Sequence, residues 1–302
     1  MDLARLDTVQ LVPPTPMSPD GSQVLPERLG EFVKARVADG IRVFLPAAGT
    51  GEFHSLTAAE VVALVRATVE ATREAAGTKC LVFAPIGFGV RHALDIAGPA
   101  ADAGADGLLL MPPIHPYLGD SGFRDYFEAI AGGTRLPLLA YKKGPCPSDN
   151  LLTELGQGGR LVGIKYAVNE IDGFRKFADR NRGRLGLYCG TAERFAPYFM
   201  LAGATGYTSG AGNLFPKLTL EMHRALVEGR SADAMRLLDR IRPLEDFRAR
   251  HGDAYNIAAV KAAMNLLGWN FGPVRPPQPR LPAADLAELE KIVRAIADRA
   301  ET

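Results

Sequence analysis

Short runs of hydrophobic residues alternate along the chain with longer segments in which hydrophobic residues recur every three or four positions. The runs lie at residues 9–15, 41–47, 79–87, 107–113, 136–142, 161–167, 185–190 and 206–212. In the segment 57–77, Val61, Leu64, Val65 and Val69 mark one face of a helix. Strands that are hydrophobic on both faces are typical of a parallel sheet covered by helices on both sides.

Eight strand-then-helix units in succession predict an α/β protein with the fold of a (β/α)8 TIM barrel, and a doubly wound open sheet is the alternative. We expect residues 1–229 to form this barrel. After Gly229 the pattern changes to three helical segments without an intervening strand, at residues 231–250, 254–268 and 282–300. Residues 230–302 are therefore predicted to form a C-terminal helical extension packed on the barrel.

Composition and charge favour a soluble globular protein. Of 302 residues, 47% are hydrophobic and 23% charged, and 35 Lys and Arg balance 34 Asp and Glu. This balance gives no electrostatic reason to expect nucleic acid or a membrane surface as a partner. Three scattered cysteines predict neither a disulfide framework nor a zinc site, and no hydrophobic stretch predicts a signal peptide or a membrane span. We expect a cytoplasmic protein with a small-molecule partner.

Lys165 interrupts the hydrophobic run LVGIKYA, residues 161–167. An unpaired buried ammonium is costly, so either a carboxylate pairs with it inside the barrel or the amine is there for chemistry. Burial lowers the pKa of a lysine and makes its amine nucleophilic at neutral pH. Because active sites of barrels lie at the carboxyl ends of the strands, Lys165 is the strongest catalytic candidate.

Other candidates follow the ends of other predicted strands. Gly49 and Thr50, in the loop AAGTGEFHSL, offer backbone N–H groups and a hydroxyl to an anion such as a carboxylate. Glu52 in the same loop is expected to brace it rather than to react. Tyr141 either caps the barrel or moves protons. Small polar residues suited to lining a pocket end the last two strands: Gly190, Thr208 and Ser209.

Two common kinds of site are not indicated. The five histidines show no spacing typical of a metal site, so no metal is expected. No G-x-G-x-x-G opens a strand–helix unit, which argues against a dinucleotide fold. Lys142 and Lys143, which follow Tyr141, are either solvated charges or ligands of a substrate carboxylate.

The loop GTGE, a tyrosine at the fifth strand and GIK in the sixth together resemble the dihydrodipicolinate synthase / N-acetylneuraminate lyase superfamily. Within it, FLPAAGTGEFHSLTAAE (44–60) and VKAAMNLLGWNFGPVRPP (260–277) are similar to segments of the 5-dehydro-4-deoxyglucarate dehydratases, whose loop reads G-T-G-E-F-F-S-L. The resemblance implies that Lys165 forms a Schiff base, that Tyr141 relays protons and that Gly49 and Thr50 bind the carboxylate beside the keto group. It also implies a tetramer built from dimers.

The expected activity is then a lyase acting on a 2-keto-3-deoxy sugar acid, most simply the dehydration and decarboxylation of 5-dehydro-4-deoxyglucarate to 2,5-dioxopentanoate without a cofactor. The segment YKKGPCPSDN (141–150) departs from the N-R-D-N that follows the tyrosine in those dehydratases, and it lacks the arginine of the synthases. A pyruvate-dependent aldolase or synthase therefore remains an alternative, and a barrel that only binds a metabolite is a third.

Overall fold

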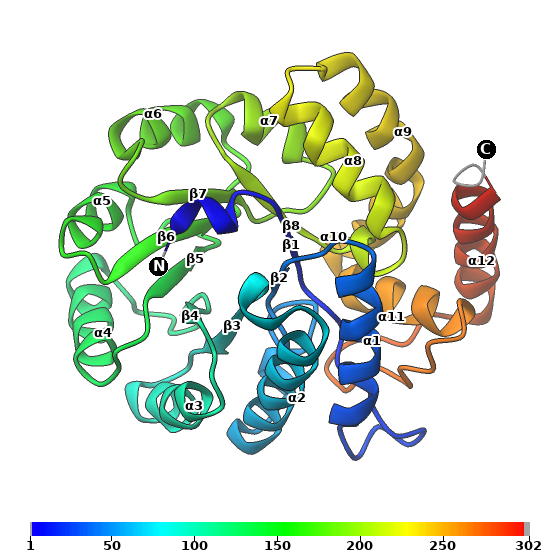
Figure 1. Ribbon diagram of the computed structural model, residues 1–302, viewed down its shortest axis with the longest axis horizontal. Coiled ribbons are helices and arrows are strands. Elements are labelled where there is room, and N and C mark those ends of the chain that lie inside the picture. Colours follow the sequence, from blue (N-terminus) through cyan, green and yellow to red (C-terminus); the bar gives the residue numbers. More distant parts are fainter. Residues whose placement is uncertain (1, 299–302) are drawn as a thin grey trace.

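The computed structural model describes residues 2–298, and its centre is a closed barrel of parallel strands in chain order (Figure 1). β1 pairs with both β2 and β8, so the sheet has no free edge. The strands are β1 (Val9–Leu11), β2 (Val43–Phe44), β3 (Leu81–Ile86), β4 (Gly107–Leu110), β5 (Leu138–Lys142), β6 (Leu161–Tyr166), β7 (Gly186–Cys189) and β8 (Gly206–Ser209). The predicted (β/α)8 TIM barrel is confirmed, and the doubly wound alternative is wrong.

Each strand is followed by a helix that covers the outside of the barrel (Figure 1). These helices are α1 (Pro26–Ala38), α2 (Ala58–Ala76), α3 (Val90–Asp102), α4 (Asp120–Gly132), α5 (Asp149–Gln157), α6 (Ile171–Asn181), α7 (Ala196–Leu201) and α8 (Pro216–Val227). Short 3-10 turns join them at η1 (Leu3–Leu6), η2 (Phe53–Ser55), η3 (Gly77–Lys79) and η4 (Ala211–Asn213). Local chemistry sets the boundaries; at the start of α2, Thr57 and Glu60 form a reciprocal capping box.

Four further helices follow α8: α9 (Ser231–Arg248), α10 (Arg250–Asp253), α11 (Asn256–Leu266) and α12 (Ala283–Asp298). They lie together on one side of the barrel, with α12 at the edge of the molecule (Figure 1). α9 packs against α8, and both α11 and α12 pack against α9. Of the predicted extension, residues 299–302 lie outside the described residues.

Some predicted boundaries differ from the structure. The segment TAERFAPYFMLAGA (191–204), which follows the seventh hydrophobic run, has a helical pattern throughout, but α7 begins only at Ala196. Ala192 has φ of 61°, a left-handed conformation that a continuous helix cannot contain. The last hydrophobic run ends as a strand at Ser209 and continues as η4, because Gly210, Gly212 and Asn213 favour a turn.

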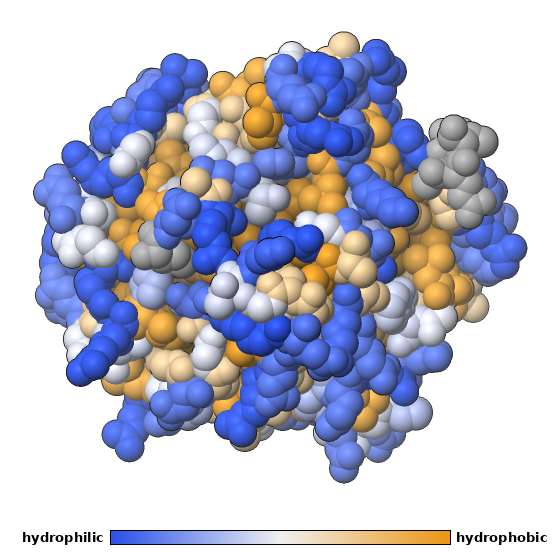
Figure 2. Space-filling view, in the orientation of Figure 1, coloured by the Kyte–Doolittle hydropathy of each residue, from blue (hydrophilic) through white to orange (hydrophobic). Residues whose placement is uncertain are grey.

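The outer helices are amphipathic, as the spacing of hydrophobic residues in the sequence predicts. Hydrophilic residues dominate the outer helices on the face shown in Figure 2, and hydrophobic residues lie in the grooves between them. Within residues 2–298, no helix combines the length and the hydrophobicity needed to cross a membrane.

Candidate active site

A cavity of about 510 Å³ opens at the carboxyl ends of the barrel strands. All of the residues that the sequence predicted for the site contribute to its lining: Gly49, Thr50, Tyr141, Lys165, Gly190, Thr208 and Ser209. They come from loops or strand ends of five different units, far apart in the sequence. The barrel therefore assembles one site from segments that have no local contact along the chain.

Lys165 lies on β6 between Tyr141 of β5 and Tyr188 of β7 in the strand register. Side chains alternate along a strand, so Lys165 points into the barrel while Tyr166 packs outside it against Phe174. Lys165 is only 4% exposed, and its Nζ lies 4.0 Å from the centre of the Tyr141 ring. No carboxylate within residues 2–298 lies at ion-pair distance from this amine, which excludes an internal ion pair with the described residues.

The surroundings of Lys165 disfavour its charged form. Burial, and then the positive charges of Lys143 and Arg248, lower the pKa of Lys165 to about 7. About half of the amine is therefore neutral near neutral pH, and a neutral amine is a nucleophile. Gly190 makes room for the side chain, because a Cβ on this residue would lie 3.0 Å from Cγ of Lys165.

Tyr141 presents a protonated phenol beside this amine. Burial, and to a smaller extent the negative charge of Asp253, raise the pKa of Tyr141 to about 12. The phenol therefore stays protonated over the physiological range and can donate a hydrogen bond or pass a proton on. Burial and the cationic repulsion around Lys165 favour an amine that becomes charged only when it reacts.

The Gly49–Thr50 loop is held in place by unusual backbone conformations. Ala47 and Glu52, which flank it, have φ of 55° and 65° in the left-handed region. A Cβ on Gly51 would lie 2.6 Å from the Cα of Ala47, so only glycine fits there. Thr15 Oγ1 also donates a hydrogen bond of 2.6 Å to the Gly51 carbonyl. The loop is thus preformed rather than ordered by a ligand.

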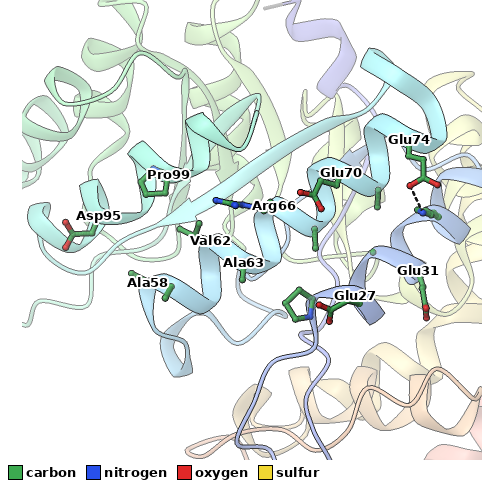
Figure 3. A pocket seen from close by; sticks show the side chains of 16 residues that line it. Glu27, Glu31, Ala58, Val62, Ala63, Arg66, Glu70, Glu74, Asp95 and Pro99 are labelled. Carbon is green, nitrogen blue, oxygen red and sulfur yellow. Dashed lines mark ion pairs between the residues drawn. The ribbon is translucent and has the colours of Figure 1, made fainter.

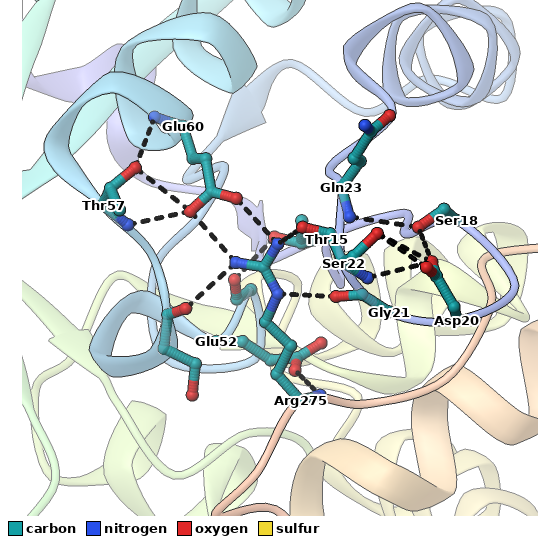
Figure 4. A network of polar contacts seen from close by, with 12 residues as sticks. Thr15, Ser18, Asp20, Gly21, Ser22, Gln23, Glu52, Thr57, Glu60 and Arg275 are labelled. Carbon is teal, nitrogen blue, oxygen red and sulfur yellow. Dashed lines mark hydrogen bonds and ion pairs between the residues drawn. The ribbon is translucent and has the colours of Figure 1, made fainter.

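Glu52 braces this loop, as expected, and the C-terminal tail provides the partners. Its carboxylate accepts a hydrogen bond from Lys261 Nζ at 2.7 Å and one from the backbone N–H of Arg275 at 2.7 Å. The guanidinium of Arg275 in turn pairs with Glu60 and donates to the carbonyls of Gly21 and Ser22 (Figure 4). A segment more than 200 residues away therefore fixes the position of the predicted anion-binding loop.

Ser209 lines the cavity, but its hydroxyl is committed to the protein. It donates to Glu193 and accepts a hydrogen bond of 2.7 Å from the Gly212 N–H. Glu193 is fully buried, also accepts from Thr219 at 3.0 Å, and has a pKa raised first by burial and then by Glu245. Thr208 Oγ1 contacts the Cys189 carbonyl at 3.4 Å. Ser209 therefore shapes the wall of the cavity, and its oxygen is not free for a ligand.

The two lysines after Tyr141 face opposite ways. Lys142 is buried outside the barrel, where its Nζ donates to the Pro147 carbonyl at 2.6 Å and pairs with Asp149 at 3.4 Å. Lys143 lines the cavity and is exposed at its mouth. Of the two, only Lys143 can meet a substrate.

Further polar residues line the cavity that sequence reasoning did not identify: His54, Arg194, Arg248, Asp253 and Asn256. Most of them come from α9 and the helices after it. On an amphipathic helix, charged residues look like an ordinary solvent-facing surface, and nothing in the local pattern marks them as part of a site. Within residues 2–298, no group of His, Cys, Asp or Glu side chains is arranged to hold a metal ion.

A second hollow of about 880 Å³ lies on the outside of the barrel between α1, α2 and α3 (Figure 3). Small apolar side chains such as Ala63 form its floor, and acidic residues including Glu27, Glu70 and Asp95 surround it. None of the predicted catalytic or binding residues contributes to its lining. The chemistry therefore belongs to the smaller cavity at the mouth of the barrel.

Comparison with known proteins agrees with this geometry. Residues 6–296 match the model of the dihydrodipicolinate synthetase family. The probable 5-dehydro-4-deoxyglucarate dehydratase of Ralstonia nicotianae is 36% identical over 257 residues, which cover 83% of this chain and 81% of that protein. The probable 5-dehydro-4-deoxyglucarate dehydratase 1 of Streptomyces coelicolor is 35% identical over 274 residues, or 88% of this chain and 85% of that protein.

Among solved structures, dihydrodipicolinate synthase from Oceanobacillus iheyensis superposes with a TM-score of 0.92 and 31% sequence identity. The match covers 98% of this chain and 100% of that one. The family match extends over the barrel and nearly all of the helices that follow it. The chain belongs to the dihydrodipicolinate synthetase family.

Proposed function

We propose that this protein is a Schiff-base-forming lyase, and specifically a 5-dehydro-4-deoxyglucarate dehydratase that releases water and CO2 and yields 2,5-dioxopentanoate. The observation that carries the proposal is the Lys165 amine, which is buried, has no carboxylate partner among residues 2–298 and lies against the ring of Tyr141. The names of the similar proteins from Ralstonia and Streptomyces support the choice of substrate.

In the first half of the reaction, the neutral Lys165 amine attacks the ketone while Gly49 and Thr50 hold the adjacent carboxylate. Loss of water from the adduct gives an iminium, which withdraws electrons from the neighbouring CH2 and acidifies it. The Tyr141 phenol passes protons at this centre, an effect that contributes roughly 10²–10⁴-fold in placed acid–base groups.

In the second half, the CH2 loses a proton and the hydroxyl on the next carbon leaves as water. The far carboxylate then departs as CO2, because the conjugated iminium accepts the electron pair left behind. Hydrolysis of the imine returns the Lys165 amine and releases the product. Each electron pair is received by the iminium, so this route uses neither a metal nor an organic cofactor.

Borohydride trapping tests the proposal. The protein is incubated with pyruvate and with several 2-keto-3-deoxy sugar acids, reduced, digested and analysed by peptide mass mapping. We expect added mass on the peptide that contains Lys165. If no keto acid labels that peptide, the Schiff-base proposal is wrong, and the protein is better described as a barrel that binds a metabolite.

A second candidate is a pyruvate-dependent aldolase or synthase, favoured by the similarity to dihydrodipicolinate synthase of Oceanobacillus iheyensis at 31% identity. Both candidates need the same lysine, so trapping does not separate them. The products do: 5-dehydro-4-deoxyglucarate releases CO2 in the dehydratase, whereas an aldolase releases pyruvate from its own substrate.

Three further expectations are part of this proposal. We propose that residues 230–302 act as an extension of the barrel formed by residues 1–229, that the protein works in the cytoplasm, and that it is a homo-oligomer, a tetramer or a dimer. Light scattering coupled to size-exclusion chromatography measures the mass of the assembly directly. A mass equal to that of one chain would contradict the proposed homo-oligomer.

A further inference from the structure

We infer that His54 and Lys143 together form the subsite for the second carboxylate of the substrate, so that the cavity selects keto diacids over keto monoacids. This inference rests on the proposed function and names the residues that choose the substrate. The charged side chains that line the cavity differ in whether they have partners within the protein.

Lys143 is the cation available to an anionic substrate. Four basic side chains line the cavity besides His54: Lys143, Lys165, Arg194 and Arg248. Arg248 pairs with Glu245 and also binds Asn256, and Arg194 pairs with Asp246 at 3.6 Å. Lys165 has to be neutral to react. Within the described residues, Lys143 alone combines a position in the lining, an exposed basic side chain and the absence of a carboxylate partner.

His54 lines the same cavity and packs against two aromatic rings. Its ring meets the rings of Phe53 and Phe88 edge-on, with centroids 5.4 Å and 5.5 Å away. Phe88 has φ of 60°, which a bulky residue adopts only when its surroundings impose it. In the part of the chain that the structure describes, neither nitrogen of His54 has a hydrogen-bond partner. The imidazole is therefore available to donate to a ligand.

His54 and Lys143 line the same cavity, and the charge of Lys143 acts on the His54 ring. Burial and then the positive charge of Lys143 lower the pKa of His54, so the surroundings of the empty cavity disfavour the imidazolium. An anion between them would accept a charge-assisted hydrogen bond from the ammonium and a second bond from the imidazole N–H. It would also offset the repulsion that lowers the pKa of His54, so binding takes up a proton.

Two acidic residues line the cavity, Asp253 and Glu245, and Glu245 is occupied by Arg248. His92 contacts Phe88 and does not line the cavity. A carboxylate is repelled by Asp253 and attracted by Lys143, whereas hydroxyl groups can donate to Asp253. We therefore expect the far carboxylate of the substrate at Lys143 and His54.

Two keto acids of equal carbon length test this subsite. Both have the ketone that Lys165 attacks, and neither has a hydroxyl group that could leave as water. Lys165 is trapped with borohydride at increasing concentrations of 2-oxoadipate, a diacid, and of 2-oxohexanoate, its monoacid counterpart. We expect half-maximal labelling by the diacid at a concentration at least tenfold lower, since hydrogen bonds to a charged group are stronger than those between neutral groups. Lys143→Met and His54→Phe should each reduce the diacid preference, which is the ratio of the two half-maximal concentrations, by about three- to tenfold. The ratio is compared because Lys143 also lowers the pKa of the Lys165 amine and so affects labelling by both acids.

Two neighbours serve as controls. Lys142→Met removes the adjacent lysine, which faces away from the cavity, and His92→Phe alters the same aromatic cluster without touching the lining. Both should keep the diacid preference of the wild type. The preference should also weaken as pH rises from about 6 to 8 in the wild type, because proton uptake by His54 is lost. His54→Phe should abolish that pH dependence.

The outcomes separate the two proposals. If both acids label Lys165 but the wild type shows no diacid preference, or if both site variants retain it, the subsite assignment is wrong and the Schiff base stands. If neither acid labels Lys165, the proposed function fails, and titration calorimetry with the same acids decides the subsite, because binding needs no imine. Equal affinities for diacid and monoacid would then overturn it.

Discussion

Two of the buried lysines of this protein, Lys165 and Lys261, do opposite things. Lys165 at the barrel mouth and Lys261 in α11 are 4% and 1% exposed, and burial lowers the pKa of both. Lys261 has Glu52 at 2.7 Å, an opposite charge that favours its ammonium. Lys165 has an aromatic ring at 4.0 Å and the positive charges of Lys143 and Arg248 around it.

The partner of a buried amine, more than its depth of burial, decides what that amine does. An ion pair with well-made hydrogen bonds keeps a charge in place and makes it a structural element. Without such a partner, the amine is stable in its neutral form, which is the form that attacks a carbonyl. The two sites are also connected, since the Lys261–Glu52 pair holds the loop whose Gly49 and Thr50 line the cavity.

The largest expected effect comes from Lys165→Met. We expect turnover to fall by at least about 10³-fold, since covalent catalysis is lost together with the amine. Stability should not fall, because the substitution removes an unpaired buried amine and keeps the packing volume. Turnover is measured by release of CO2 and stability by urea denaturation. A variant that loses stability instead, and keeps turnover, would assign Lys165 the structural role.

Lys261→Met should show the reverse pattern. Removing one partner of a buried ion pair leaves the Glu52 carboxylate uncompensated and typically costs about 3–5 kcal/mol of unfolding free energy. Turnover should fall only as far as the Gly49–Thr50 loop loosens, and borohydride should still label Lys165 in the folded fraction. Lys217→Met, at an exposed lysine of α8, is the matched control and should change the unfolding free energy by less than about 0.5 kcal/mol.

Tyr141→Phe should have a smaller and purely kinetic effect. The substitution keeps the ring against the Lys165 amine but removes the proton of the phenol. We expect kcat to fall by at least tenfold while trapping of Lys165 remains possible. Unchanged kcat, measured under saturating substrate, would remove Tyr141 from the proton relay and leave it as a wall of the cavity.

Much of this arrangement could be predicted from the sequence, because its causes are local or periodic. The strands are continuous hydrophobic runs since helices cover them, and Lys165 was noticeable because a charge interrupts such a run. The bracing role of Glu52 could be expected because a carboxylate in such a loop can accept hydrogen bonds from backbone N–H groups. The division of the chain at residue 229 and the roles of the site residues stay predictions.

Other parts had no local signal. Glu193 was placed in a predicted helix, but the left-handed Ala192 ends that pattern and the carboxylate turns inward to Ser209. Lys142 and Lys143 are indistinguishable in sequence, and only the alternation of β5 sends one outside the barrel and the other to the mouth. Asp253 reaches the cavity through consecutive left-handed residues at His251, Gly252 and Asp253, which no periodicity predicts.

The most direct test is a titration of the Lys165 amine itself. Competitive labelling of lysines with an amine-specific reagent, read by peptide mass mapping from pH 5 to 11, gives the pKa of each amine in one experiment. The lowered pKa means that Lys165 binds its proton only below about 7, so its labelling should rise through that pH and be nearly complete by pH 9. The peptide that contains exposed Lys217 serves as the reference for labelling in the same digest. A Lys165 amine that titrates near 10.5 would contradict the account.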